Sequence, residues 1–282
     1  MKPKEQRVNV MKKSNQKRNF GISLLIAGCI VSGASVAAAV DPSPKKIMEN
    51  ASTARMLDGS EAVMSLTIVN EKGQKRVRDI AMASKTFDGG KTEKRVFKFL
   101  SPADVKGTGV LIFDYESKDD DMWIYLPAMR KTRRIVSSDK SKNFMGSEFS
   151  NADMNTPILD NYKLKTLGSE KVDGVDCYKI EALPKNDKVA DEEGYSKKIV
   201  WVGKTDFMIR KSVFYDLDGA LLKELTVKKI QLVDKGKKRY RGMHMEMVNK
   251  QNNRKAIFET KKIENSPNVK DEIFTTQYLE RP

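Results

Sequence analysis

Apolar and polar residues alternate along most of the chain after residue 60, and this pattern predicts β-strands. In the segment 61–70, Met64, Leu66 and Ile68 share one side of an extended backbone. Turn sequences such as EKGQ, DGGK and KDDD separate the alternating segments. Strands joined by short turns pair antiparallel, so we expect a meander of about eleven strands.

Helical signals lie at both ends of this series of strands. Ser43 and Pro44 are typical of an N-cap and a first helical position, and apolar residues follow at helical spacing up to Leu57. Residues 269–282 are predicted to form a short closing helix, while residues 137–154 break the strand rhythm. Because strands and helices do not alternate, we expect a mainly β (α+β) fold, with one antiparallel sheet curled into a barrel or half-barrel.

The first forty residues have the pattern of an export signal. Seven lysines and arginines between Lys2 and Arg18 precede an uncharged run, 20–40, that contains three consecutive alanines near its end. A basic segment, an apolar segment and a small-residue cleavage site are typical of a secretory signal peptide. We therefore expect residues 1–39 to be cleaved and residues 40–282 to form a single domain, with Met11 as an alternative start.

Two other interpretations of this leader stay open. The sequence Ile26-Ala27-Gly28-Cys29 resembles a lipobox, in which Cys29 would carry a lipid, although the residues after it stay apolar. The uncharged run also has about the 20 residues that span a bilayer, but its glycine, serine and alanine content would make a weak anchor.

The chain stays basic after the expected cleavage. Residues 1–39 hold 7 of the 53 basic and 1 of the 38 acidic residues, which leaves 46 basic and 37 acidic residues and a net charge of +9. Such an excess favours an anionic partner, for example a membrane surface, although it is also common on solvated surfaces. We expect no nucleic-acid partner, because no nucleic-acid-binding module is visible.

Residues that carry common enzyme chemistry are scarce after residue 39. Cys177 is then the sole thiol and His244 the sole histidine, so a disulfide, a zinc site or a Ser–His–Asp triad is hard to build. We expect a buried Cys177 and a structural His244. Three aspartates at 119–121 fit a solvated turn better than a cation site, and we expect no metal, no cofactor and no enzymatic activity.

Apolar side chains share one face within several predicted strands and are candidates for the wall of a binding cavity. The alternative is that they simply fill the core, but a curled sheet with such a concave face also suits an apolar ligand. Flexible methionines suit a surface that must repack around different partners. The candidates are Phe97, Phe99, Leu111, Phe113, Trp123, Tyr125, Met243, Met245 and Met247.

The region 100–154 contains three distinctive segments: LSPADVKGTGVLIFDY, DDMWIYLPAMRKTRRI and FMGSEFSNADM. These segments resemble the motifs of the outer-membrane lipoprotein-sorting family, relatives of the periplasmic lipoprotein carrier LolA. In that family the third motif usually continues with Tyr-Glu-Asp, where this chain has Asn151-Ala152-Asp153. The resemblance implies an unclosed antiparallel β-barrel covered by helices, with an apolar cavity that shields acyl chains in the periplasm.

The resemblance also implies a function. We expect a non-enzymatic carrier, a monomer, that binds lipid or lipoprotein acyl chains, touches membranes transiently and transfers its cargo towards the outer membrane with an RND-type permease. Basic residues would form the rim of the cavity and meet head groups or the permease: Arg130, Lys131, Arg133 and Arg134. The alternative is a periplasmic regulatory protein of the same fold that senses lipids or lipoproteins.

Overall fold

Antiparallel strand pairing organises the part of the chain that the computed structural model describes, residues 41–281, and thirteen strands form one sheet. The strands are β1 (Gly59–Val69), β2 (Lys75–Phe87), β3 (Thr92–Ser101), β4 (Gly109–Tyr115), β5 (Asp121–Leu126), β6 (Lys131–Arg134), β7 (Tyr162–Val172), β8 (Val175–Pro184), β9 (Lys197–Gly203), β10 (Ile209–Tyr215), β11 (Leu221–Asp234), β12 (Arg239–Asn249) and β13 (Lys255–Asn265). Across the sheet their order is β6-β5-β4-β3-β2-β1-β13-β12-β11-β10-β9-β8-β7.

The sheet is unclosed, because β6 and β7 are its two edges. Its first and last strands in sequence, β1 and β13, pair in the interior of the sheet, so the two halves of the chain extend from this pair in opposite directions. The predicted mainly β fold is therefore confirmed, with thirteen strands in place of about eleven. The predicted hairpin around the KDDD turn is also present, since β4 pairs with β5.

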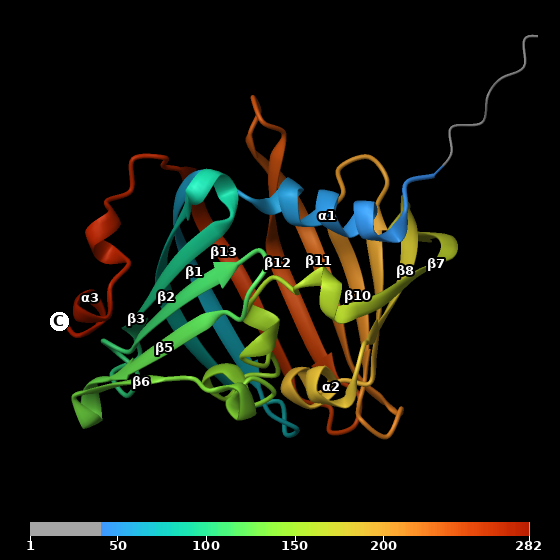
Figure 1. The fold of residues 1–282 in the computed structure, drawn as a ribbon. Helices are drawn as coiled ribbons and strands as arrows, with labels where there is room; N and C mark the ends of the chain where they lie inside the picture. Colours follow the sequence, from blue (N-terminus) through green and yellow to red (C-terminus); the bar gives the residue numbers. More distant parts are fainter. Residues whose placement is uncertain (1–40, 282) are drawn as a thin grey trace, which may run out of the picture. The chain divides into compact units, whose positions relative to one another are not determined.

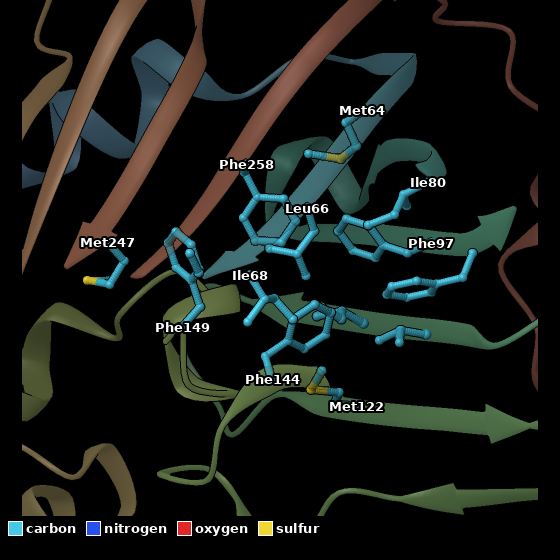
Figure 2. Close-up of a cluster of buried hydrophobic side chains, with 14 of the residues drawn as sticks. Met64, Leu66, Ile68, Ile80, Phe97, Met122, Phe144, Phe149, Met247 and Phe258 are labelled. Carbon is cyan, nitrogen blue, oxygen red and sulfur yellow. The ribbon is translucent and has the colours of Figure 1, made fainter. Parts of the chain in front are cut away.

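Large apolar side chains gather on one face of this sheet, which we call the inner face. Leu66, Phe97 and Phe258 are almost completely buried there. Figure 2 shows this cluster, in which side chains from β1, β3 and β13 meet Phe144 and Phe149. Burying such a large set of apolar groups is the main source of stability in a chain with no disulfide among the described residues.

The helix α1 (Pro44–Arg55) covers part of the inner face. The Ser43 hydroxyl accepts a hydrogen bond from the Lys46 amide at 3.2 Å, and Pro44 is the first residue of the helix, as predicted. Ile47 and Met48 pack against Ile180 on β8 and neighbouring side chains of β9. Figure 1 shows α1 crossing the strands near one of their ends, where it contacts β12, β9 and β7.

The predicted irregular segment 137–154 forms three short 3₁₀ turns that also lie over the inner face. Phe144 and Phe149 are buried, with ring centroids 6.4 and 5.0 Å from that of Phe258. Residues 144 and 147–152 therefore belong to the core, whereas residues 137, 138 and 141–143 are exposed.

The opposite face, which we call the outer face, is covered near β3, β4 and β5 by the end of the chain. The predicted closing helix is present as α3 (Thr276–Leu279), and Figure 1 shows it beside these strands. Phe274 packs edge-on against Phe87, with 5.9 Å between ring centroids. A Cβ atom at Gly109 would lie 2.9 Å from Leu279 Cδ2, so any larger residue there would displace the Leu279 side chain.

Two elements are not predicted by the sequence pattern. The edge strand β6 consists of four polar residues, so it has no apolar alternation. The helix α2 (Asp187–Glu193) is seven residues long and has no buried residue. Its ends nevertheless carry signals, because the Asn186 side chain caps the Val189 amide at 3.0 Å and Gly194 adopts a left-handed conformation.

The predicted signal peptide and its alternatives, including Met11 and Cys29, lie outside the described residues. Between residues 41 and 281, no helix has the length and apolar character needed to cross a bilayer. Cys177 is completely buried, as predicted.

We expect Leu279→Ala to lower the free energy of unfolding by about 2–5 kcal/mol, because the substitution leaves a cavity beneath the closing segment on the outer face. Urea denaturation of the mature chain measures this change. Leu217→Ala is the matched control, since Leu217 is 52% exposed and should change stability by less than about 0.5 kcal/mol. Equal effects of the two substitutions would show that the closing segment does not stabilise the sheet.

Candidate functional site

A cavity of about 400 Å³ lies between the inner face of the sheet, α1 and the connection 149–161. Its volume is within the range of roughly 300–1,000 Å³ typical of small-molecule sites. Residues from ten strands line it, including β3 on one side and β12 on the other. The cavity is therefore a product of the curled sheet and its cover, and no single strand pair forms it.

Methionine is the most frequent residue in the apolar part of the wall. Thioether side chains are flexible and polarisable, so they can adjust to ligands of different shape. Phe97, Phe214 and Phe258 add aromatic surface beside them. Seven methionines line the cavity: Met48, Met64, Met82, Met154, Met208, Met245 and Met247.

A group of buried charges interrupts this apolar wall, and we call it the arginine cluster: Arg55, Glu93, Arg95, Asp114 and Arg241. The Glu93 carboxylate lies 3.4 Å from an Arg55 nitrogen, 3.6 Å from Arg95 Nε and 3.7 Å from an Arg241 nitrogen. Burial opposes ionisation of Glu93, but Arg95, Arg55 and Arg241 outweigh it and hold the pKa of this carboxyl below its usual value. Burial also lowers the pKa of Arg241 to about 10, so Arg241 stays charged at neutral pH.

The second carboxylate of the arginine cluster, Asp114, binds protein donors through one of its oxygens, Oδ2. It accepts hydrogen bonds from an Arg95 nitrogen at 2.7 Å and from the Thr156 amide and hydroxyl at 2.9 and 2.7 Å. Arg55 also donates to the Thr156 hydroxyl. These contacts attach the connection after residue 154 to both β4 and α1.

A second buried ion pair fixes the third sequence motif, 144–154, over the sheet. The Asp153 carboxylate accepts hydrogen bonds from Lys223 Nζ at 2.8 Å and Tyr195 Oη at 2.9 Å. Burial opposes its ionisation, but Lys223 and Lys198 lower the pKa of Asp153 below its usual value. The motif residues are thus anchored to β11, and Asp153 is also part of the cavity wall.

Asp120 contributes an unusual carboxyl to the same cavity. Its side chain accepts a hydrogen bond from the Tyr115 amide at 2.9 Å. Burial, together with the nearby charge of Asp114, raises the pKa of Asp120 to about 7, against a usual value of 3.8. Asp120 therefore titrates in the neutral range, far above an ordinary aspartate.

The structure divides the predicted wall residues between the two faces of the sheet. Phe97, Met245 and Met247 line the cavity. Phe99 belongs to the core of the inner face, and Met243 lies on β12 outside the cavity wall. The other four candidates pack on the outer face with the closing segment of the chain: Leu111, Phe113, Trp123 and Tyr125.

The physical reason is the register between neighbouring strands. Leu111 pairs with Val96 and with Trp123, so these three side chains share a face. Phe97, one residue after Val96, points to the other face. Alternation within one strand shows which of its residues share a face. It does not show which residues of neighbouring strands lie on that same face.

The predicted rim residues lie on or beside the edge strand β6, and all four are exposed. Arg133 pairs with Asp139 at 3.3 Å, and Arg134 pairs with Asp121. Within the described chain, Arg130 and Lys131 form no ion pair, and none of the four lines the cavity of about 400 Å³. They therefore form a basic sheet edge.

The charged residues of the cavity are absent from the sequence-based candidates, although a signal for them exists. Glu93 and Arg95 share the parity of Phe97 on β3, and Arg241 shares that of Met245 on β12. Each stripe of apolar side chains thus continues into charged residues on the same face. No group of three or more His, Cys, Asp or Glu side chains suited to a metal ion occurs in residues 41–281.

We expect Asp120 to make stability depend on pH. Because its folded-state pKa of about 7 lies above the usual value, its contribution is fully present below about pH 4 and is lost as the pH rises through 7. Asp120→Asn keeps an acceptor for the Tyr115 amide and removes this loss, so its stability relative to wild type should increase from pH 5 to pH 8 in urea denaturation. The exposed neighbour provides the control Asp119→Asn, and parallel pH curves for Asp120→Asn and wild type would contradict the assignment.

Comparison with known proteins shows the family to which this chain belongs. A family model described as an uncharacterized protein matches residues 91–281. A domain from Vibrio parahaemolyticus, described as an outer membrane lipoprotein-sorting protein domain, is 30% identical and superimposes with a TM-score of 0.76, covering 84% of this chain and 97% of its own. None of the curated proteins matches the chain.

Two further solved structures agree. A DUF1329 family protein from Desulfovibrio piger is 29% identical, with a TM-score of 0.75 over 85% of this chain and 100% of its own. A LolA superfamily protein from Nitrosomonas europaea is 19% identical, with a TM-score of 0.63 over 84% and 100%, and shares the fold. This chain belongs to the outer membrane lipoprotein-sorting protein family and has the LolA-like fold.

Proposed function

We propose that this protein is a non-enzymatic carrier that binds lipid or lipoprotein acyl chains in the cavity on the inner face of its sheet. The observation that carries the proposal is the methionine-lined cavity of about 400 Å³ beneath α1. A cover made of a helix and a motif segment would allow a ligand to be enclosed and released without unfolding the sheet. The description of the Vibrio parahaemolyticus relative as a lipoprotein-sorting domain supports the same role.

The energetic basis of such a carrier is the removal of an acyl chain from water. Each buried CH₂ group contributes about 0.8 kcal/mol. A chain that places even eight CH₂ groups against this wall would therefore gain roughly 6 kcal/mol before the entropy of binding is subtracted. Adaptable methionines would allow one cavity to hold chains of different length.

We further propose where the carrier works. An exported chain with a cleaved leader would act in the periplasm as a monomer and transfer its cargo towards the outer membrane, with an RND-type permease as the donor. The basic sheet edge at Arg130 and Lys131 is available for transient contact with an anionic membrane, because both residues are exposed and neither forms an ion pair in the described structure.

We expect Ser52→Trp to weaken binding of a fluorescent fatty acid by at least tenfold. Ser52 faces the cavity from α1, so an indole at this position would exclude at least two CH₂ groups, worth about 1.6 kcal/mol. The control is Thr53→Trp, which places the same ring on the exposed side of the helix. Fluorescence titration of the delipidated mature protein gives the three affinities. Equal affinities for Ser52→Trp and wild type, or no binding by any form, would overturn the proposal.

We expect the double substitution Arg130→Gln and Lys131→Gln to weaken association with anionic phospholipid vesicles about 30-fold, since each basic residue near such a surface contributes about 1 kcal/mol. Vesicle sedimentation measures the effect. The control, Lys163→Gln with Lys165→Gln, removes two exposed lysines from the opposite edge strand, β7. If both double variants lose binding equally, the membrane contact depends on net charge and not on the β6 edge.

A further inference from the structure

The arginine cluster contains more positive than negative charge. Three guanidinium groups, from Arg55, Arg95 and Arg241, surround two carboxylates, Glu93 and Asp114. All five side chains are largely or almost completely buried. Four of the five line the cavity: Arg55, Glu93, Arg95 and Arg241. Buried charges are costly unless they are paired, so the surplus cation is a feature that calls for an anion.

Arg241 is the cation of this cluster that forms an ion pair but no hydrogen bond within the described residues. A guanidinium group carries five N–H donors, yet within the described residues no hydrogen bond from the Arg241 side chain is present. Its nearest carboxylate oxygen, on Glu93, lies 3.7 Å away, beyond hydrogen-bonding distance. Arg241 therefore faces the cavity with its donors available.

The neighbouring carboxylates give Arg241 no hydrogen bond. Glu93 Oε2 contacts Arg55 and Arg95, whereas Glu93 Oε1 accepts no hydrogen bond within the described residues and lies 3.7 Å from Arg241. Asp114 Oδ2 already accepts three hydrogen bonds. Asp120, the next carboxyl along the cavity, accepts from the Tyr115 amide. Glu192 pairs with Lys140 at 3.1 Å. The polar end of the cavity thus offers a cation to whatever occupies it.

The position of Arg241 relative to the apolar wall defines what kind of anion fits. Arg241 lies on the same face of β12 as Met245 and Met247, which follow it by four and six residues and also line the cavity. On β3, the cavity-lining Arg95 is likewise followed on the same face by an apolar residue, Phe97. A ligand with an anionic end and an apolar chain would match both strands.

We propose that Arg241, supported by Arg55 and Arg95, binds the carboxylate or phosphate head group of an acyl lipid inside the cavity, with the chain along the methionines. This inference rests on the proposed carrier function and deepens it. It distinguishes the protein from a carrier that encloses only acyl chains and leaves the head group in water.

The test compares ligands that share a chain and differ in charge. Delipidated mature protein is titrated by calorimetry with dodecanoate and with dodecanol, and inorganic phosphate is added at millimolar concentration as a competitor. We expect wild type to bind dodecanoate at least tenfold more tightly than dodecanol, and Arg241→Met to lose most of that preference while its affinity for dodecanol is unchanged. Arg239→Met, on the same strand and outside the cavity wall, should behave as wild type.

The outcomes separate the two proposals. Binding of both ligands with equal affinity by wild type would overturn the head-group site and leave the carrier function standing. Binding of neither ligand would overturn the carrier function. If phosphate alone displaces dodecanoate through Arg241, the site takes free anions and the head-group inference is wrong. The dodecanol affinity of Arg241→Met also reports whether that variant folds, and the wild-type preference needs no variant at all.

Discussion

The site depends on the ion pairs of the Glu93 carboxylate, because this group lies between residues from opposite walls of the cavity. Its partners Arg55 and Arg241 come from α1 and β12, whereas Glu93 itself is on β3. Three strands separate β3 from β12 in the sheet. An ion pair between β3 and β12 is possible only if the sheet curls. The Glu93 ion pairs therefore hold the sheet in its curved form and attach α1 over the cavity.

A single carboxylate can stabilise this arrangement because the three buried guanidinium groups need a nearby negative charge. Burial alone would favour a neutral Glu93, and the three guanidinium groups reverse that preference. Removing Glu93 would leave three buried cations close together, which is far costlier than losing one hydrogen bond. The Asp153–Lys223 pair has the same role at the motif segment, where it ties residues 144–154 to β11.

Much of this fold follows from local pattern, but the site does not. Alternation locates most strands, and Ser43 with Pro44 marks α1, because these signals act over a few residues. Leu111 and Phe97 look equivalent in sequence, yet the structure puts them on opposite faces, since the face is decided by pairing across strands. The contact between Glu93 and Arg241 joins residues 148 positions apart in the sequence, and no local pattern encodes it.

The proposal that an acyl lipid occupies the methionine-lined cavity is tested most directly by identifying what copurifies with the protein. The full-length chain, expressed with its leader in a Gram-negative host and purified without detergent, would be analysed by native mass spectrometry followed by lipid extraction. We expect a near-stoichiometric adduct of lipid mass that releases acyl chains on extraction. A protein that is recovered folded, free of lipid and unable to take up added lipid would contradict it.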